Sequence, residues 1–184
     1  MTPQLQKDYV AILKEELVPA TGCTEPIAIA YAAAKLRQTL GAAPEKVLAE
    51  VSGNILKNVK SVVVPNTGGL KGIRAAISVG IVAGEADREL QVISSVSPDR
   101  HAAIASYCKE TPIKIVCPDT PRVLDIRLTG WAGQDEATVH IANNHSNLVL
   151  IRKNGEILLE KPLAVSAEDG LTDKRCLNLR DILD

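Results

Sequence analysis

The sequence predicts an α+β fold in which Ala-rich buried helices pack on a small antiparallel sheet. Apolar residues recur mostly at helical spacing before residue 112, whereas apolar and polar residues alternate after it, as they do in strands. Aromatic residues make up only 2% of the chain, and Phe is absent. The core must therefore consist of Ala, Val, Ile and Leu.

Two helices are expected near the N-terminus. Residues 3–17 carry apolar side chains at helical spacing, which predicts an amphipathic helix. A second helix is expected over residues 25–40, with Thr24 or Glu25 as its cap and Gly41 at its end. Its middle, IAIAYAAAKL, is almost entirely apolar or small, so this helix is expected to be buried.

The middle of the chain is expected to contain both strands and helices. VLAEVSGNI at 47–55 alternates like a half-buried strand, and ELQVISSVS at 89–97 is also predicted to be a strand. Helices are predicted at 70–84 and 99–110, because glycine and proline stand at their boundaries.

The last part of the chain predicts a meander of three to four antiparallel strands. The alternating segments are PIKIVCP, VLDIRLTG, EATVHIAN and NLVLIRKNGEILLEK. In the last segment, the pair Asn154 and Gly155 between two alternating flanks predicts a type I′ hairpin. We expect a single α+β domain over 1–165. Residues 166–184 are expected to be a linker and the start of a truncated next element, because the helical pattern of LNLRDILD stops at the last residue.

Composition and charge argue against several functional classes. A net charge of -1 lacks the cationic surplus that nucleic-acid binding requires, so nucleic acid is not an expected partner. The sequence contains no apolar run of about 18 or more residues, so no membrane span is expected. The charged N-terminal segment is unlike a signal peptide. We therefore expect a cytoplasmic protein.

The four cysteines include no CxxC pair, and we expect this chain to bind no metal by itself. Cys108 and Cys117 are predicted to be small core residues, since one ends an Ala-rich helix and the other an apolar strand. Cys23 differs, because Gly22 precedes it and a predicted helix follows it. A helix N-terminus stabilises a thiolate, which would make Cys23 reactive; a buried spacer is the alternative interpretation.

Two further segments carry polar candidates. Asn54, Lys57 and Asn58 interrupt an otherwise apolar stretch, and Lys57 can bind a carboxylate. Asn66 and Thr67 belong to VPNTGG, a loop whose backbone can form an anion-binding nest. Two ordinary loops with a solvated lysine are the alternative.

Histidine supplies the remaining candidates. His145 lies between two predicted strands among Asn and Ser residues, and it can act as a general acid or base or as a proton relay. A histidine in a surface turn is the alternative. His101 is expected to be solvated at a helix start, and His140 is expected to face out of a strand.

The motifs GCTEP, SGNILKNVKSVVVPNTGG and HSNLV occur in an order that resembles the L-cysteine desulfidase family, which is related to the alpha portion of the iron–sulfur L-serine dehydratases. The resemblance runs through the whole chain. It implies β-elimination of L-cysteine to sulfide, pyruvate and ammonia, with Cys23 as the base that removes the α-proton. It also implies a substrate pocket whose polar lining is Asn54, Lys57, Asn66, Thr67 and His145.

The resemblance further implies a longer protein. Family members continue well beyond this region and hold a 4Fe-4S cluster through cysteines of their later half, and Cys108, Cys117 and Cys176 match none of these. The stretch ANNHSN also replaces a more glycine-rich one. We therefore expect the N-terminal domain of a lyase, inactive as this chain alone, whose partner is the missing C-terminal cluster domain.

Three alternatives stay open. The substrate can be L-serine, as in an L-serine dehydratase, because only the β-leaving group differs. The chain can instead be a non-catalytic domain that binds an amino acid through Lys57 and the loop at 67–69. It can also be one subunit of a split enzyme, and its small-residue helices suit a homodimer as well as an internal core.

Overall fold

The computed structural model describes residues 2–17, 19–163 and 172–183. Contacts divide the chain into two compact units. The larger unit spans Ala20–Leu163, and the smaller one combines Met1–Pro19 with Ala164–Asp184. The expected domain boundary between residues 165 and 166 lies outside the described residues and stays a prediction.

The smaller unit is helical. Its elements are α1 (Pro3–Glu16), η3 (Lys174–Cys176) and α6 (Leu179–Leu183). These bounds confirm the N-terminal helix and the helical pattern of the last residues. Tyr9 joins the two ends of the chain within this unit, because its hydroxyl donates to the carbonyl oxygen of Cys176 and accepts from the backbone N–H of Asn178.

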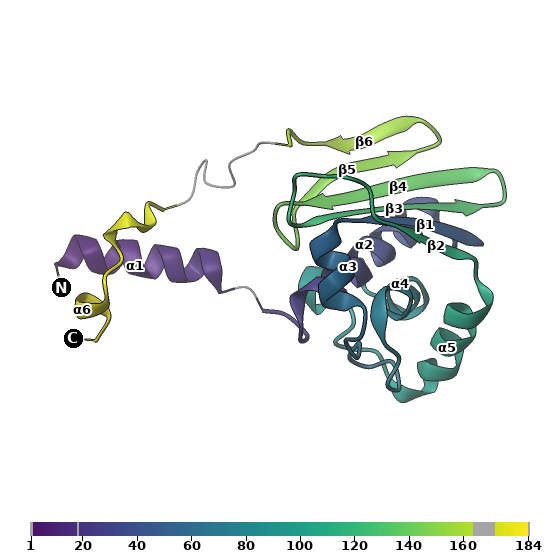
Figure 1. The fold of residues 1–184 in the computed structure, drawn as a ribbon, viewed down its shortest axis with the longest axis horizontal. Helices are drawn as coiled ribbons and strands as arrows, with labels where there is room; N and C mark the ends of the chain where they lie inside the picture. The colour runs from purple at the N-terminus through teal and green to yellow at the C-terminus, as the bar shows by residue number, and fades with distance from the viewer. Residues whose placement is uncertain (1, 18, 164–171, 184) are drawn as a thin grey trace. The chain divides into compact units, whose positions relative to one another are not determined.

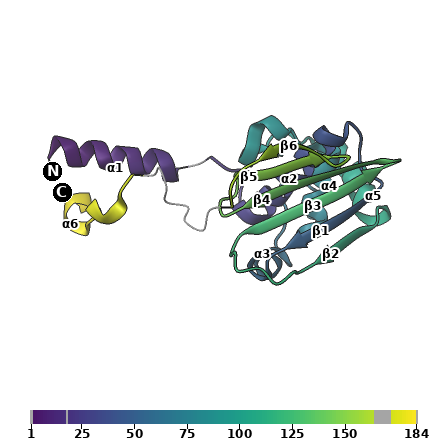
Figure 2. The same ribbon diagram turned by 90° about the horizontal axis from the view of Figure 1, so that it is seen from above.

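The larger unit contains a six-stranded sheet in the order β2-β1-β3-β4-β5-β6, with β2 and β6 at its edges (Figures 1 and 2). Its strands are β1 (Lys46–Val51), β2 (Ile113–Val116), β3 (Asp125–Ala132), β4 (Asp135–Ala142), β5 (Leu148–Lys153) and β6 (Glu156–Glu160). The α+β class is confirmed. The sheet is larger than expected, and it is mixed because β1 and β2 pair in parallel.

Helices cover one face of this sheet (Figure 1). They are α2 (Thr24–Leu40), α3 (Gly53–Val59), α4 (Gly72–Ala83), η1 (Ala86–Gln91), η2 (Pro98–Arg100) and α5 (His101–Glu110). The predicted helices at 25–40, 70–84 and 99–110 are thereby confirmed. No helix in the described ranges combines the length and apolarity needed to cross a membrane.

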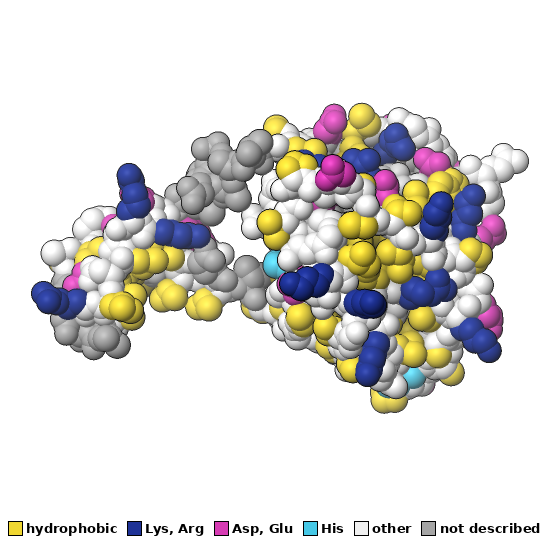
Figure 3. Space-filling model, in the orientation of Figure 1, with side chains coloured by type: hydrophobic (Ala, Val, Ile, Leu, Met, Phe, Trp, Pro, Cys, Tyr) yellow, Lys and Arg dark blue, Asp and Glu magenta, His cyan; other side chains and the backbone are white. Residues whose placement is uncertain are grey.

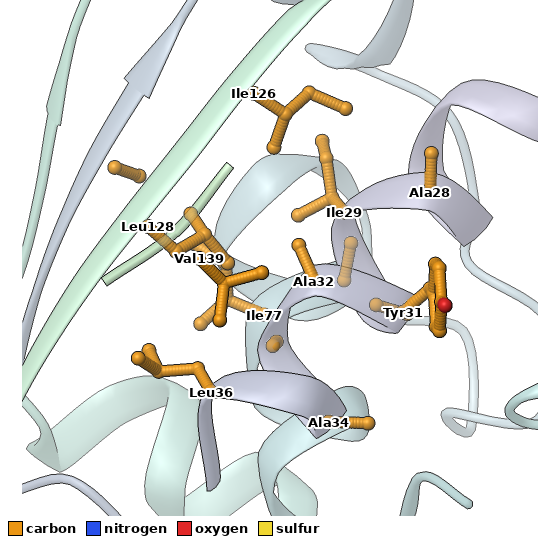
Figure 4. Packing of buried hydrophobic residues seen from close by; sticks show 14 of the residues in the cluster. Ala28, Ile29, Tyr31, Ala32, Ala34, Leu36, Ile77, Ile126, Leu128 and Val139 are labelled. Carbon is orange, nitrogen blue, oxygen red and sulfur yellow. The ribbon is translucent and has the colours of Figure 1, made fainter. Parts of the chain in front are cut away.

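Helix α2 lies at the centre of the core, as its Ala-rich sequence predicts. Every residue from Pro26 to Ala34 is buried. Figure 4 shows Ile29 and Ala32 of α2 on the side that faces Ile126 of β3 and Val139 of β4. Small and aliphatic side chains thus fill the space between the sheet and the helices, and no large aromatic cluster is needed.

Two of the predicted strands differ in the structure. The predicted strand at 89–97 is wrong: Glu89 has a φ of 47°, which interrupts an extended backbone, and the segment forms η1 followed by turns. Its adjacent residues Val92 and Ile93 are both buried, and they reach the core from these turns. The strand predicted at 47–55 ends earlier, because Ser52 caps α3 by accepting a hydrogen bond from the Ile55 backbone N–H.

The predicted hairpin is confirmed between β5 and β6. Asn154 and Gly155 have φ values of 50° and 86°, as a type I′ turn requires. The local sequence signal was sufficient here because the turn residues themselves determine the strand register.

Candidate functional site

Three segments meet at one end of the larger unit: the loop before α2, helix α3, and the turn between β4 and β5 (Figure 1). The loop is held in place by Thr21, whose backbone N–H donates to the carbonyl oxygen of Leu90 at 3.0 Å. Gly22 has a φ of 120°, and a Cβ there would lie 3.1 Å from Cγ of Pro65. A glycine is therefore needed for GCTEP to pack against the VPNTGG loop.

Cys23 is the N-cap residue of α2, and its thiol donates a hydrogen bond to Oε2 of Glu25 at 3.3 Å. The residue is exposed overall, but partial burial of its sulfur, the hydrogen bond and the charge of Glu25 together raise the pKa of Cys23. The backbone N–H of Glu25 lowers that pKa, as the helix N-terminus predicts, but it is outweighed. The expected thiolate is therefore not the resting form.

Glu25 connects three side chains of the site. Besides the Cys23 thiol, its carboxylate accepts a hydrogen bond at 3.4 Å from Nδ2 of Asn58 on α3. Burial alone would raise the pKa of Glu25, but hydrogen bonds from its backbone N–H, Cys23 and Asn58, and the positive charge that His145 carries when it is protonated at acidic pH, lower it overall. Glu25 is therefore ionised at neutral pH.

His145 lies in the turn between β4 and β5 and is half-buried. Burial lowers the pKa of His145, and the carboxylate of Glu25 opposes part of this effect. The turn is held by Asn147, whose Nδ2 donates to the carbonyl oxygen of Ala142 at 3.0 Å. At neutral pH the imidazole is therefore largely uncharged and able to accept a proton.

Asn54 and Lys57 lie beside this group. Asn54 precedes Lys57 by three residues and Asn58 by four residues on α3. It therefore shares a helix face with both of them. All three residues are exposed. Because Asn58 contacts Glu25, this face of α3 borders the hydrogen-bonded pair of Cys23 and Glu25. A substrate-binding role for Asn54 and Lys57 stays a prediction.

Asn66 and Thr67 bind the backbone of the protein. Asn66 Nδ2 donates to the carbonyl oxygen of Ile93 at 2.9 Å. The buried hydroxyl of Thr67 donates to the carbonyl oxygen of Val64 at 2.7 Å and accepts from the backbone N–H of Leu70 at 3.1 Å. Both side chains thus hold the VPNTGG loop in shape, and their predicted contact with substrate stays untested.

Glu25 and Asn58 were absent from the predicted site. A signal for Glu25 existed, since it stands two residues after Cys23 within GCTEP. Asn58 stood out as a polar residue of its segment, but its place in the site depends on its contact with Glu25, which is 33 positions away. Sequence motifs reveal such a pair only when the packing of α2 against α3 is known.

The remaining cysteines lie elsewhere. Cys117 is exposed just beyond the end of the edge strand β2, so its predicted burial is wrong, and Cys108 on α5 is half-buried. Cys176 belongs to the smaller unit. Within the ranges that the structure describes, no three His, Cys, Asp or Glu side chains are grouped to hold a metal ion. These residues do not fit a 4Fe-4S cluster, and we derive no chemical step through one.

A second polar cluster surrounds His140 on the sheet face opposite the helices. Its Nε2 lies 2.6 Å from Oδ1 of Asp125, and Nε of Arg122 lies 2.5 Å from Oδ2 of the same carboxylate. Burial would raise the pKa of Asp125, but these partners lower it to about 2. His140 was expected to face out of its strand; it faces away from the helices but is only 2% exposed, because these neighbours cover it.

The chain was compared with known proteins. It is 49% identical over 177 residues to a UPF0597 protein of Treponema denticola, and 48% identical over 176 residues to one of Desulfitobacterium hafniense; each match covers 96% of this chain and 41% of the relative. A UPF0597 protein of Fusobacterium nucleatum is 40% identical over 189 residues, which cover all of this chain and 43% of the relative. This chain is similar to UPF0597 proteins.

These relatives correct the expected family. They are named UPF0597 proteins and not L-cysteine desulfidases, so the expected membership in the desulfidase family is wrong. No family model matches the chain, and no solved structure matches it. The chain spans about two-fifths of the length of these relatives.

Proposed function

We propose that this chain binds a small α-amino acid and transfers its protons within a lyase that eliminates the β-substituent, with L-cysteine as substrate. The supporting observation is that a thiol and a largely neutral imidazole lie around the carboxylate of Glu25. β-Elimination needs a base for the α-proton and an acid for the leaving group. Lys57 provides a cation for the substrate carboxylate on the adjoining face of α3.

In this proposal, His145 is the base and Cys23 the acid. The α-proton passes to the imidazole, the electron pair of the C–H bond forms the Cα–Cβ double bond, and the C–S bond breaks with its pair on sulfur. The departing sulfide takes a proton from the Cys23 thiol. The imidazolium then returns its proton to the thiolate. The 2-aminoacrylate product tautomerises to an imine, which water hydrolyses to pyruvate and ammonia.

The roles follow from the protonation states of the two side chains. Burial of the sulfur and the neighbouring Glu25 keep Cys23 protonated, so the thiol begins the reaction as a proton donor rather than as the base expected from the sequence. Burial keeps His145 largely uncharged, so it begins as an acceptor. Combined acid and base catalysis requires one group that is protonated at the start of the reaction and one that is not.

The proposal includes a cytoplasmic location, since all four cysteines are free thiols and such thiols persist in reducing compartments. It also places any iron–sulfur cluster of the whole protein on residues outside this chain. The complete reaction is proposed for the complete protein, because the relatives extend well beyond the matched region.

A non-catalytic amino-acid-binding domain is the second candidate. The observation in its favour is the raised pKa of Cys23, which suits a structural N-cap as well as a proton donor. This candidate predicts that L-cysteine or L-serine binds without turnover, and that binding survives Cys23→Ser.

The test uses the complete protein that contains this chain, produced and assayed without oxygen. Sulfide and pyruvate are measured with L-cysteine, and pyruvate is measured with L-serine. We expect both products from L-cysteine, a loss of about 100-fold or more in Cys23→Ser, and normal activity in Cys108→Ser, which removes a half-buried thiol on α5.

The possible outcomes separate the candidates. Faster pyruvate formation from L-serine than from L-cysteine would assign the site to a dehydratase. Calorimetric binding of either amino acid without any product would support the binding domain and contradict the lyase.

A further inference from the structure

A pocket of about 470 Å³ lies at the amino end of β1, whereas the candidate site begins beyond the carboxyl end of that strand. Its walls come from β1, the start of β2, the end of β3 and helix α4. This volume is in the range of pockets that hold small organic ligands. The pocket shares no residue with the candidate site around Cys23, Glu25 and His145. An inference about this pocket therefore does not depend on the proposed reaction.

The charged groups of this pocket are all cations. Lys46, Arg74 and Lys114 line it, and no Asp or Glu does. In the described part of the chain, none of these three side chains forms an ion pair. Unpaired cations close together raise the local positive potential and attract an anion.

Arg74 is fixed in a way that leaves its charge uncompensated. Its guanidinium donates hydrogen bonds of 2.8 to 3.0 Å to the backbone carbonyl oxygens of Cys108, Thr111 and Ile113. These neutral acceptors immobilise the side chain without neutralising it. A positive charge is therefore positioned beside the pocket before any ligand arrives.

The rest of the wall is apolar and contains an aromatic ring. Trp131 lies on β3 directly opposite Lys46 of β1, and Nζ of Lys46 is 4.4 Å from the centre of the ring. The indole N–H donates to Oε2 of Glu136 at 2.9 Å, which holds the ring in place. Leu48, two residues after Lys46 and in register with Lys114, adds an apolar side chain on the same face of the sheet. Figure 3 shows Lys and Arg side chains around hydrophobic ones on the part of the larger unit where β1, β2 and α4 lie.

We propose that this pocket binds an organic anion that joins an acidic group to a flat apolar body. The acidic group, a carboxylate, sulfonate or phosphate, lies between Lys46 and Lys114. The apolar body lies along Trp131 and Leu48. Cations beside an apolar wall fit this class of ligand better than a fully polar anion, for which the wall would provide no partner.

Trp131 makes the proposal directly measurable, because it is the only Trp in the sequence. The probe is 1-anilinonaphthalene-8-sulfonate, an aromatic sulfonate, and its neutral counterpart N-phenyl-1-naphthylamine is the matched control. We expect saturable quenching of Trp131 and sensitised dye emission with the sulfonate. The neutral dye should bind more weakly than the sulfonate by a factor of about ten or more.

Paired variants locate the binding. The double variant Lys46→Gln/Lys114→Gln should weaken the sulfonate about tenfold, whereas Lys7→Gln/Lys14→Gln, which removes the same charge from the smaller unit, should not. Circular dichroism establishes that both variants are folded. Displacement of the dye by benzoate or by phenyl phosphate identifies the acidic group that is preferred. Equal binding of the neutral dye, equal effects of the two double variants, or displacement by neither competitor would overturn the proposal.

Discussion

The Sγ atom of Cys23 and Oε2 of Glu25 lie 3.3 Å apart, and the thiol donates its proton to the carboxylate. The same carboxylate accepts from Asn58 and interacts with His145, so one acidic residue connects α2, α3 and the turn between β4 and β5. Burial of the sulfur and the ionised carboxylate both disfavour a thiolate, so the N-terminus of α2 does not activate Cys23 at rest.

The first prediction concerns the reactivity of Cys23. Since its pKa is raised, the wild-type thiol should react with iodoacetamide more slowly than free cysteine at neutral pH. Glu25→Gln removes the negative charge, so the pKa of Cys23 should fall and its alkylation should become several-fold faster. Mass spectrometry of the labelled peptides gives both rates. Cys117, which is exposed in the same chain, is the internal control and should not respond to Glu25→Gln. Alkylation of wild-type Cys23 faster than free cysteine would contradict the raised pKa.

The second prediction concerns the buried pair of Asp125 and His140. The pKa of Asp125 is about 2 in the folded protein, below its unfolded value of about 3.9. The stability that this carboxylate provides is therefore complete above pH 4 and is lost as the pH falls through 2. Asp125→Asn should lower the free energy of unfolding by roughly 2 kcal/mol at pH 7 and by much less at pH 2.

Urea unfolding followed by the emission of Trp131, which lies on β3, measures this difference in the larger unit. Asp119→Asn is the matched control, because Asp119 lines a pocket together with Asp125 and His140 but is itself exposed. A difference between wild type and Asp125→Asn that is equally large at both pH values would contradict the linkage.

The third prediction concerns the contact between α2 and α4. A Cβ on Gly80 would lie 2.2 Å from the carbonyl oxygen of Ala30 and 2.9 Å from Cβ of Ala33. Gly80→Ala should therefore destabilise the protein by about 1–3 kcal/mol through overpacking, although alanine favours helices. Gly53→Ala is the control, since its Cβ would meet only the sulfur of Cys117 at 3.9 Å. Thermal unfolding compares the two variants, and a fully stable Gly80→Ala would show that the helices are not in close contact.

Local patterns predicted the elements whose determinants are local. The burial of α2 followed from its run of apolar and small residues, and the β5–β6 hairpin followed from Asn154 and Gly155. The mixed sheet did not follow, because β1 and β2 are distant in sequence and no turn residue indicates their parallel pairing. The 89–97 segment was misassigned because apolar residues in buried turns resemble a short strand.

The candidate site was predictable in part. The motifs identified Cys23 and placed Lys57 and His145 among the candidates. The protonation state of the thiol depends on burial and on Glu25, whose role and contact with Asn58 were not predicted. The burial of His140 could not be anticipated either. It results from neighbours on β3 and the preceding loop, which cover a histidine on the sheet face opposite the helices.

The most direct measurement of the central claim is exchange of the α-proton of L-cysteine in D₂O, followed by NMR with the complete protein. The claim is that His145 removes this proton and that Cys23 protonates the leaving group. Wild-type protein should incorporate deuterium at Cα, and His145→Gln should lower that rate about 100-fold or more. Cys23→Ser should keep the exchange while losing sulfide formation. Exchange that is unaffected by His145→Gln, or that is abolished by Cys23→Ser, would contradict this assignment of base and acid.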